Sequence, residues 1–152
     1  MTQRFRPFLL AAGLLVSFHA LADVGIGAPW IRATVPAQSS TGAFMQLKSD
    51  RPTRLVAVSS PVAGRVEIHQ MEMQGATMRM HAVDGIDLPA GQAVNLAAGG
   101  YHVMLFDLRR QLKDGEQVPM TLRFVGAGDK REDVTVQVPV KPLNFAGAPA
   151  GH

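Results

Sequence analysis

Histidine and methionine residues are concentrated in residues 69–104, and these side chains are suited to bind a soft metal ion. Residues 66–81 alone contain two histidines and four methionines, and His102 and Met104 stand at the far end of the stretch. Imidazole nitrogen binds many transition metals, whereas thioether sulfur is a soft ligand that selects Cu(I). The first hypothesis is therefore a soft-metal site.

Residues 66–83 predict a β-hairpin that gathers these side chains on one face. Residues 67, 69, 71 and 73 share a face because successive side chains of a strand point to opposite sides. Gln74-Gly75 predicts a two-residue turn with Gly at its second position. With that turn, His69 faces Met80 and Met71 faces Met78. Opposed Cβ atoms lie about 4.5–5.5 Å apart, so one ion could bridge an imidazole and a thioether.

A further predicted strand, residues 101–107, carries His102, Met104 and Phe106 on one face. Docking this face beside the His69/Met80 pair would assemble two nitrogen and two sulfur donors. Ca²⁺ and Mg²⁺ prefer oxygen ligands, and structural Zn²⁺ prefers thiolate or imidazole. We therefore predict a Cu(I) site formed by His69, Met80, His102 and Met104.

The rest of the chain predicts an all-β domain, a β-sandwich or Greek-key barrel. Short apolar or alternating runs are separated by turn signals such as Asp84-Gly85, Gly99-Gly100 and Asp114-Gly115. No long amphipathic helix and no internal repeat is visible. The expected strands are residues 30–34, 42–48, 55–59, 66–73, 77–83, 93–96, 101–107, 118–125 and 134–140.

The first 22 residues predict a cleaved secretory signal. Arg4 and Arg6 precede an apolar run over residues 8–18, and residues 20–22 (ALA) fit a cleavage site after Ala22. The run is shorter than the roughly 20 residues of a membrane-spanning helix. We expect export to the periplasm, no stable membrane insertion, a β domain over residues 23–142 and a flexible tail over residues 143–152.

Composition excludes several function classes. Without Arg4 and Arg6 the chain has 15 − 2 = 13 basic and 12 acidic residues, so no nucleic-acid partner is expected. The absence of cysteine excludes lipidation of a cysteine, a thiol reductase, and an electron-transfer copper site, which needs a Cys thiolate. No catalytic motif is visible, so the protein is not expected to be an enzyme. It is expected to be a monomer.

The ligand spacing resembles the signature of the periplasmic copper chaperone family PCuAC, once known as DUF461. Ten residues separate His69 from Met80, twenty-one separate Met80 from His102, and one separates His102 from Met104. The similarity extends over nearly all of residues 23–152, including residues 30–33 (WIRA), 41–45 (TGAFM), 66–69 (VEIH), 88–91 (LPAG) and 99–105 (GGYHVML).

This resemblance implies a cupredoxin-like Greek-key β-barrel that holds one Cu(I) near its surface. It also implies delivery of copper to the CuA-bearing subunit of cytochrome oxidase, alongside Sco-type thiol proteins. A periplasmic copper buffer or resistance protein would use the same ligands and stays open as an alternative. So does an exported module with incidental methionines, which would bind no Cu(I).

Other histidines and methionines have open or structural roles at this stage. Met71 and Met78 are candidates for a transfer role or for support of the site, although methionine most often fills hydrophobic space. Met45 and Met120 fall in strand patterns and are expected in the core. His81 has the opposite parity to Met80 and should point away from the site. Whether His81 or the terminal His152 forms a Cu(II) site stays open; we expect His152 to be solvated.

Overall fold

The computed structural model describes residues 23–147, so the predicted signal segment and His152 lie outside the described residues. Strands make up most of the described chain, and the helical structure there is limited to one three-residue 3-10 turn, which confirms the predicted all-β class. In this part of the chain no helix is long and apolar enough to cross a membrane. The elements are β1 (Val24–Arg32), β2 (Ser40–Ser49), β3 (Thr53–Ser59), β4 (Ala63–Gln74), β5 (Thr77–Ala82), β6 (Ile86–Leu88), β7 (Ala93–Leu96), β8 (Tyr101–Leu108), β9 (Gln117–Gly126), the 3-10 turn η1 (Ala127–Asp129) and β10 (Arg131–Lys141).

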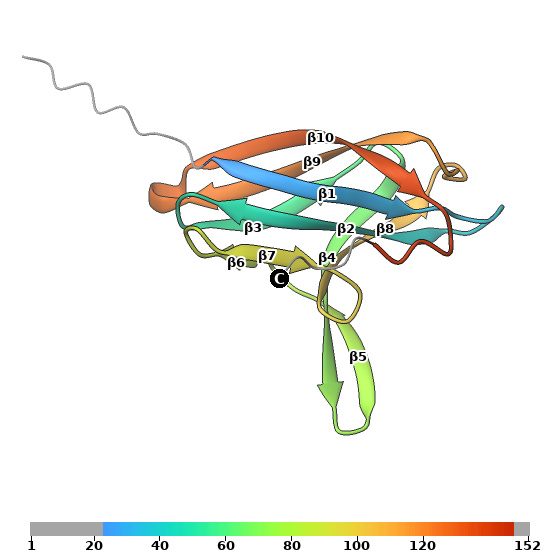
Figure 1. The fold of residues 1–152 in the computed structure, drawn as a ribbon, viewed down its shortest axis with the longest axis horizontal. Helices are drawn as coiled ribbons and strands as arrows, with labels where there is room; N and C mark the ends of the chain where they lie inside the picture. The colour runs from blue at the N-terminus through green and yellow to red at the C-terminus, as the bar shows by residue number, and fades with distance from the viewer. Residues whose placement is uncertain (1–22, 148–152) are drawn as a thin grey trace, which may run out of the picture.

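The strands form one sheet that folds over a single core (Figure 1). Their order is β5-β4-β8-β2-β1-β10-β9-β3-β6, and β7 pairs with β2 beside this path. The two halves meet where β1 and β10 run parallel, with Ile31 opposite Val140. The fully buried Leu105 of β8 and Phe124 of β9 belong to the same core cluster, so the halves pack face to face.

Two departures from the predicted strands have local causes. β1 begins at Val24, earlier than expected, because a register irregularity between Gly27 and Trp30 lets the strand pass Pro29. Ala28 takes a positive φ of 44° there. β6 was not predicted, since three residues are too short to show alternation. It nonetheless pairs with β3, so that Leu88 lies opposite Thr53 and Ile86 lies opposite Leu55.

The predicted hairpin forms, but its predicted register is wrong by two residues. Gly75 takes the first turn position with φ 62°, the glycine position of a type II′ turn, and not the second position. His69 therefore faces Ala82 on β5, and Met80 faces Met71. A shift of two residues keeps every side chain on its predicted face. Figure 1 shows this β4–β5 hairpin extending away from the body of the molecule.

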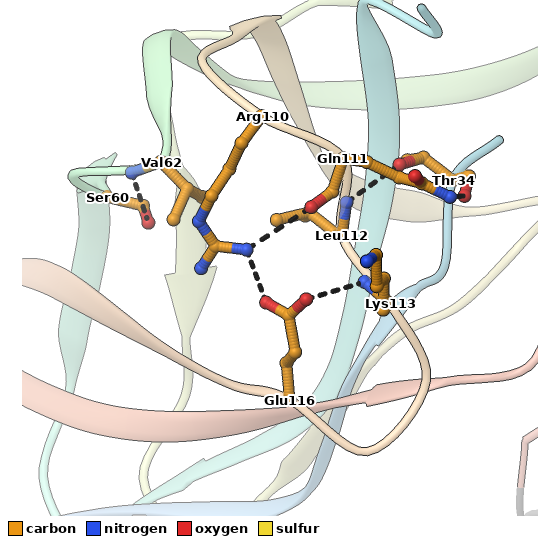
Figure 2. Close-up of polar contacts among 8 residues, drawn as sticks. All are labelled: Thr34, Ser60, Val62, Arg110, Gln111, Leu112, Lys113 and Glu116. Atoms are coloured by element: carbon orange, nitrogen blue, oxygen red, sulfur yellow. Dashed lines mark hydrogen bonds and ion pairs between the residues drawn. The ribbon is translucent and has the colours of Figure 1, made fainter. Parts of the chain in front are cut away.

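Figure 2 shows how the long loop between β8 and β9 is fixed. Thr34 and Leu112 exchange two bonds of 2.9 Å: the Thr34 N–H donates to the Leu112 carbonyl, and the Leu112 N–H donates to the Thr34 hydroxyl. The Glu116 carboxylate accepts from the Arg110 guanidinium and from the Lys113 N–H. The loop is thereby attached to the segment that follows β1.

Candidate metal centre

His69 and His102 are direct neighbours across β4 and β8. Their ring centroids are 5.9 Å apart. Although both point away from the core, they are only 7% and 6% exposed. The adjacent Ile68 and Val103 point to the opposite face and belong to the core. The alternation of each strand thus fixes the histidine pair on one side and the hydrophobic core on the other.

Met80 brings a sulfur atom to this pair from the edge strand β5. Its Sδ lies 3.0 Å from His102 Nε2. His102 Nδ1 donates to the Gly100 carbonyl oxygen at 3.3 Å, and because a carbonyl only accepts, this nitrogen carries the ring proton. Burial lowers the pKa of His102, which favours the neutral ring. The Nε2 lone pair therefore faces a sulfur lone pair with no proton between them, an arrangement that a soft cation can bridge.

His69 is held in the same way by a carboxylate. Its Nε2 donates to Glu67 Oε2 at 2.7 Å. Nδ1 is buried and has no hydrogen-bond partner among the described residues. Metal-binding histidines commonly donate their second ring N–H to a carboxylate or carbonyl. Both rings therefore have one nitrogen engaged and the other available as a ligand, which fits a metal site.

Glu67 is a residue to which the sequence analysis gave no role. Its carboxylate also accepts from Arg65 Nη1 at 2.5 Å. The hydrogen bond from His69, and secondarily the charge of Arg65, lower the pKa of Glu67. The signal was present in the shared parity of residues 67 and 69, but a glutamate next to a strand histidine is usually just solvated.

Met104 lies on the same face as His102, opposite Glu67 on β4 and Gly42 on β2. Its side chain is half-buried. Gly42 leaves room for the Phe44 ring, because a Cβ at position 42 would lie 2.8 Å from Cζ of Phe44 and would force that ring to shift. The Phe44 ring in turn lies 6.4 Å from the His102 ring. Phe44 and Gly42 thus shape the side of the site next to Met104.

Phe106 borders the His69 ring of the histidine pair. Its ring centroid is 5.7 Å from that of His69, and the guanidinium of Arg65 lies 4.5 Å from the Phe106 ring centre. Aromatic rings on both flanks keep the imidazoles largely out of water.

The remaining candidates fall into three groups. Met45 and Met120 are buried in the core, as predicted. His81 pairs with Gln70 on the opposite face of the hairpin and is exposed. Met71 and Met78 lie on the face of His69, as predicted. They do not face each other, because Met71 pairs with Met80 and Met78 pairs with Met73. Within residues 23–147, no three His, Asp or Glu side chains form a group that could hold a metal.

Comparisons with known proteins agree with this architecture. A family model described as lipoprotein LpqE-like matches residues 24–140. The protein Lxx21020 of Leifsonia xyli is 31% identical over 128 residues, which cover 82% of this chain and 72% of that protein. The copper-bound PCuAC domain from PmoF2 superposes with a TM-score of 0.61 at 30% identity, covering 78% of this chain and 92% of that domain.

A second solved structure, CuI-DR1885 from Deinococcus radiodurans, has a TM-score of 0.56 at 32% identity and covers 83% of this chain and 79% of that one. The fold is therefore that of a PCuAC domain, and the cupredoxin-like class expected from the sequence is confirmed. The chain belongs to the LpqE-like family.

Proposed function

We propose that the protein is a Cu(I) metallochaperone. One Cu(I), carried as cargo, is bound by His69, Met80, His102 and Met104 and is released to a partner by ligand exchange. The observation that carries this proposal is the 3.0 Å approach of His102 Nε2 and Met80 Sδ beside the His69–His102 pair. The likeness to the copper-bound PCuAC domain from PmoF2 and to CuI-DR1885 supports the choice of metal.

The donor set suits a site that must both hold and release its ion. Neutral imidazoles and thioethers bind Cu(I) without thiolate charge. Met80 is 47% exposed and lies on the edge strand β5, so an incoming ligand can displace it first. The two histidines, both buried, would retain the ion until the exchange is complete. No bond rearrangement other than metal coordination is needed, which is consistent with a non-enzymatic role.

The binding test is an anaerobic titration with Cu(I) in competition with a colorimetric chelator. Wild type should bind tightly. The Cu(I) affinity of His69→Ala and of Met104→Leu should each fall by more than the roughly 10–100-fold that is usual when a hydrogen-bond partner of a metal ligand is lost. His81→Ala is the matched control, because His81 lies on the opposite face of the same hairpin. Unchanged affinity in both site variants would refute the ligand set.

For the recipient, we propose the CuA-bearing subunit of cytochrome oxidase, reached in the periplasm after cleavage following Ala22, with Sco-type thiol proteins as further partners. Mixing the Cu(I)-loaded protein with an apo CuA domain should transfer the copper. Retention of copper by a protein that binds it tightly would instead favour the alternative, a periplasmic copper buffer or resistance protein.

A further inference from the structure

The projecting β4–β5 hairpin carries a second group of methionines on the face of His69. Met71 lies opposite Met80, and Met73 lies opposite Met78. Directly opposed residues in an antiparallel pair have Cβ atoms about 4.5–5.5 Å apart. Thioethers on flexible side chains at this spacing can converge on one ion.

These methionines do not serve as core packing. Met73 and Met78 are 62% and 46% exposed, whereas the core residues Met45 and Met120 are 4% and 0% exposed. Met71, closer to the body, is half-buried. Met73 and Met78 lie farther along the hairpin than His69, and their exposed side chains are accessible to an ion in solution.

We propose that Met71, Met73 and Met78 form an outer site for a soft monovalent cation such as Cu(I). Three neutral sulfur donors select such an ion over Ca²⁺, Mg²⁺ and Zn²⁺. Without an imidazole, this outer site binds more weakly than the histidine site.

Met80 connects the outer site to the inner one. It faces Met71 across the hairpin, and its Sδ contacts His102 Nε2. An ion held by the outer sulfurs can therefore move inward by exchanging one thioether for another, with no change of oxidation state. The transfer of the ion to the inner site rests on the proposed function, whereas binding at the outer site does not.

The test uses protein labelled with ¹³C at the methionine methyl groups and titrated with Ag(I), an air-stable soft monovalent ion. We expect the first equivalent to shift the methyl signals of Met80 and Met104. The second equivalent should shift those of Met71, Met73 and Met78. The buried Met45 and Met120 are internal references that should not move.

Variants separate the two sites. Met73→Leu/Met78→Leu should reduce the stoichiometry from two ions to one. The control Glu72→Gln/Arg79→Gln alters a directly paired couple on the opposite face of the hairpin and should still bind two. In His69→Ala/His102→Ala the outer methyl signals should still shift.

Saturation of wild type by one ion, with the Met71, Met73 and Met78 signals unmoved, would overturn the outer site and leave the proposed function intact. Conversely, movement of only those three signals would support the outer site and contradict the proposed function.

Discussion

His69 and His102 each engage one ring nitrogen with an acceptor of the protein, and this determines which nitrogen is left for a metal. Glu67 holds Nε2 of His69, so Nδ1 is the free atom; the Gly100 carbonyl holds Nδ1 of His102, so Nε2 is free. The tautomers are thus set before any ion arrives. The four proposed ligands could be selected from the sequence. The ring orientations of the two histidines could not, since they depend on contacts made only in the folded protein.

Glu67→Gln tests the importance of the ring orientation. The amide can still accept a hydrogen bond from His69, but it lacks the charge that strengthens the bond. We expect Cu(I) affinity to fall by about 10–100-fold, the usual cost of altering such a partner, in the chelator competition assay. Glu72→Gln, an exposed position on the other face of β4, is the control and should bind like wild type.

Burial of His102 predicts a pH dependence of stability in the metal-free protein. Because its pKa is lowered in the folded state, the unfolded chain binds a proton more readily as pH falls through the ordinary histidine pKa of 6.5. Neutral His102 therefore contributes its full stability above that pH, and this contribution is lost as the pH falls toward the lower pKa of the folded state. Urea unfolding at pH 7.5 and pH 5 should show a larger loss of free energy of unfolding for wild type than for His102→Asn. Equal losses would contradict this reading.

At the scale of elements, alternation was enough to place side chains on faces but not to set the hairpin register. Residues 67–73 and 78–80 have the expected parity, which is why the sequence could bring His69 and Met80 to one face. The exact pairing depends on which turn position Gly75 occupies. The sequence Gln74-Gly75-Ala76 allows a turn at residues 74–75 or at residues 75–76. Similarly, the position of β8 beside β4 results from long-range packing that no local pattern records.

Gly75→Ala should weaken the site through the hairpin. Alanine at a φ of 62° costs about 1–2 kcal/mol, which opposes the pairing that brings Met80 to His102. We expect up to about 5–30-fold lower Cu(I) affinity, the equilibrium equivalent of that cost. Gly115→Ala carries a similar backbone penalty, since Gly115 has φ 89°, but it lies in the loop between β8 and β9. It should leave the affinity unchanged, and equal effects of both variants would refute a hairpin mechanism.

For the whole molecule, the core and the site occupy opposite faces of the same strands. The core is shared by both halves of the sheet, and its largest fully buried side chain is Phe124. The all-β class could be predicted because short runs and turn signals recur along the chain. The parallel β1–β10 contact and the short β6 could not, because both depend on the assembled fold.

Phe124→Ala should lower the free energy of unfolding by about 3–5 kcal/mol, since it removes buried surface and leaves a cavity. Val35→Ala, at a side chain that is 49% exposed, should change it by no more than about 0.5 kcal/mol. Denaturant unfolding of both variants measures these values. A loss below about 1 kcal/mol in Phe124→Ala would mean that the two halves do not share the core described here.

The central claim is that one Cu(I) is bound by two imidazole nitrogens and two thioether sulfurs on the outer face of β4, β5 and β8. X-ray absorption spectroscopy of the protein loaded with one equivalent of Cu(I) tests it most directly, with Met73→Leu/Met78→Leu as background to remove two of the three outer sulfurs. The spectrum should show a first shell of both nitrogen and sulfur, and Met104→Leu should reduce the sulfur contribution. A shell of nitrogen or oxygen alone, unchanged by that substitution, would contradict the claim.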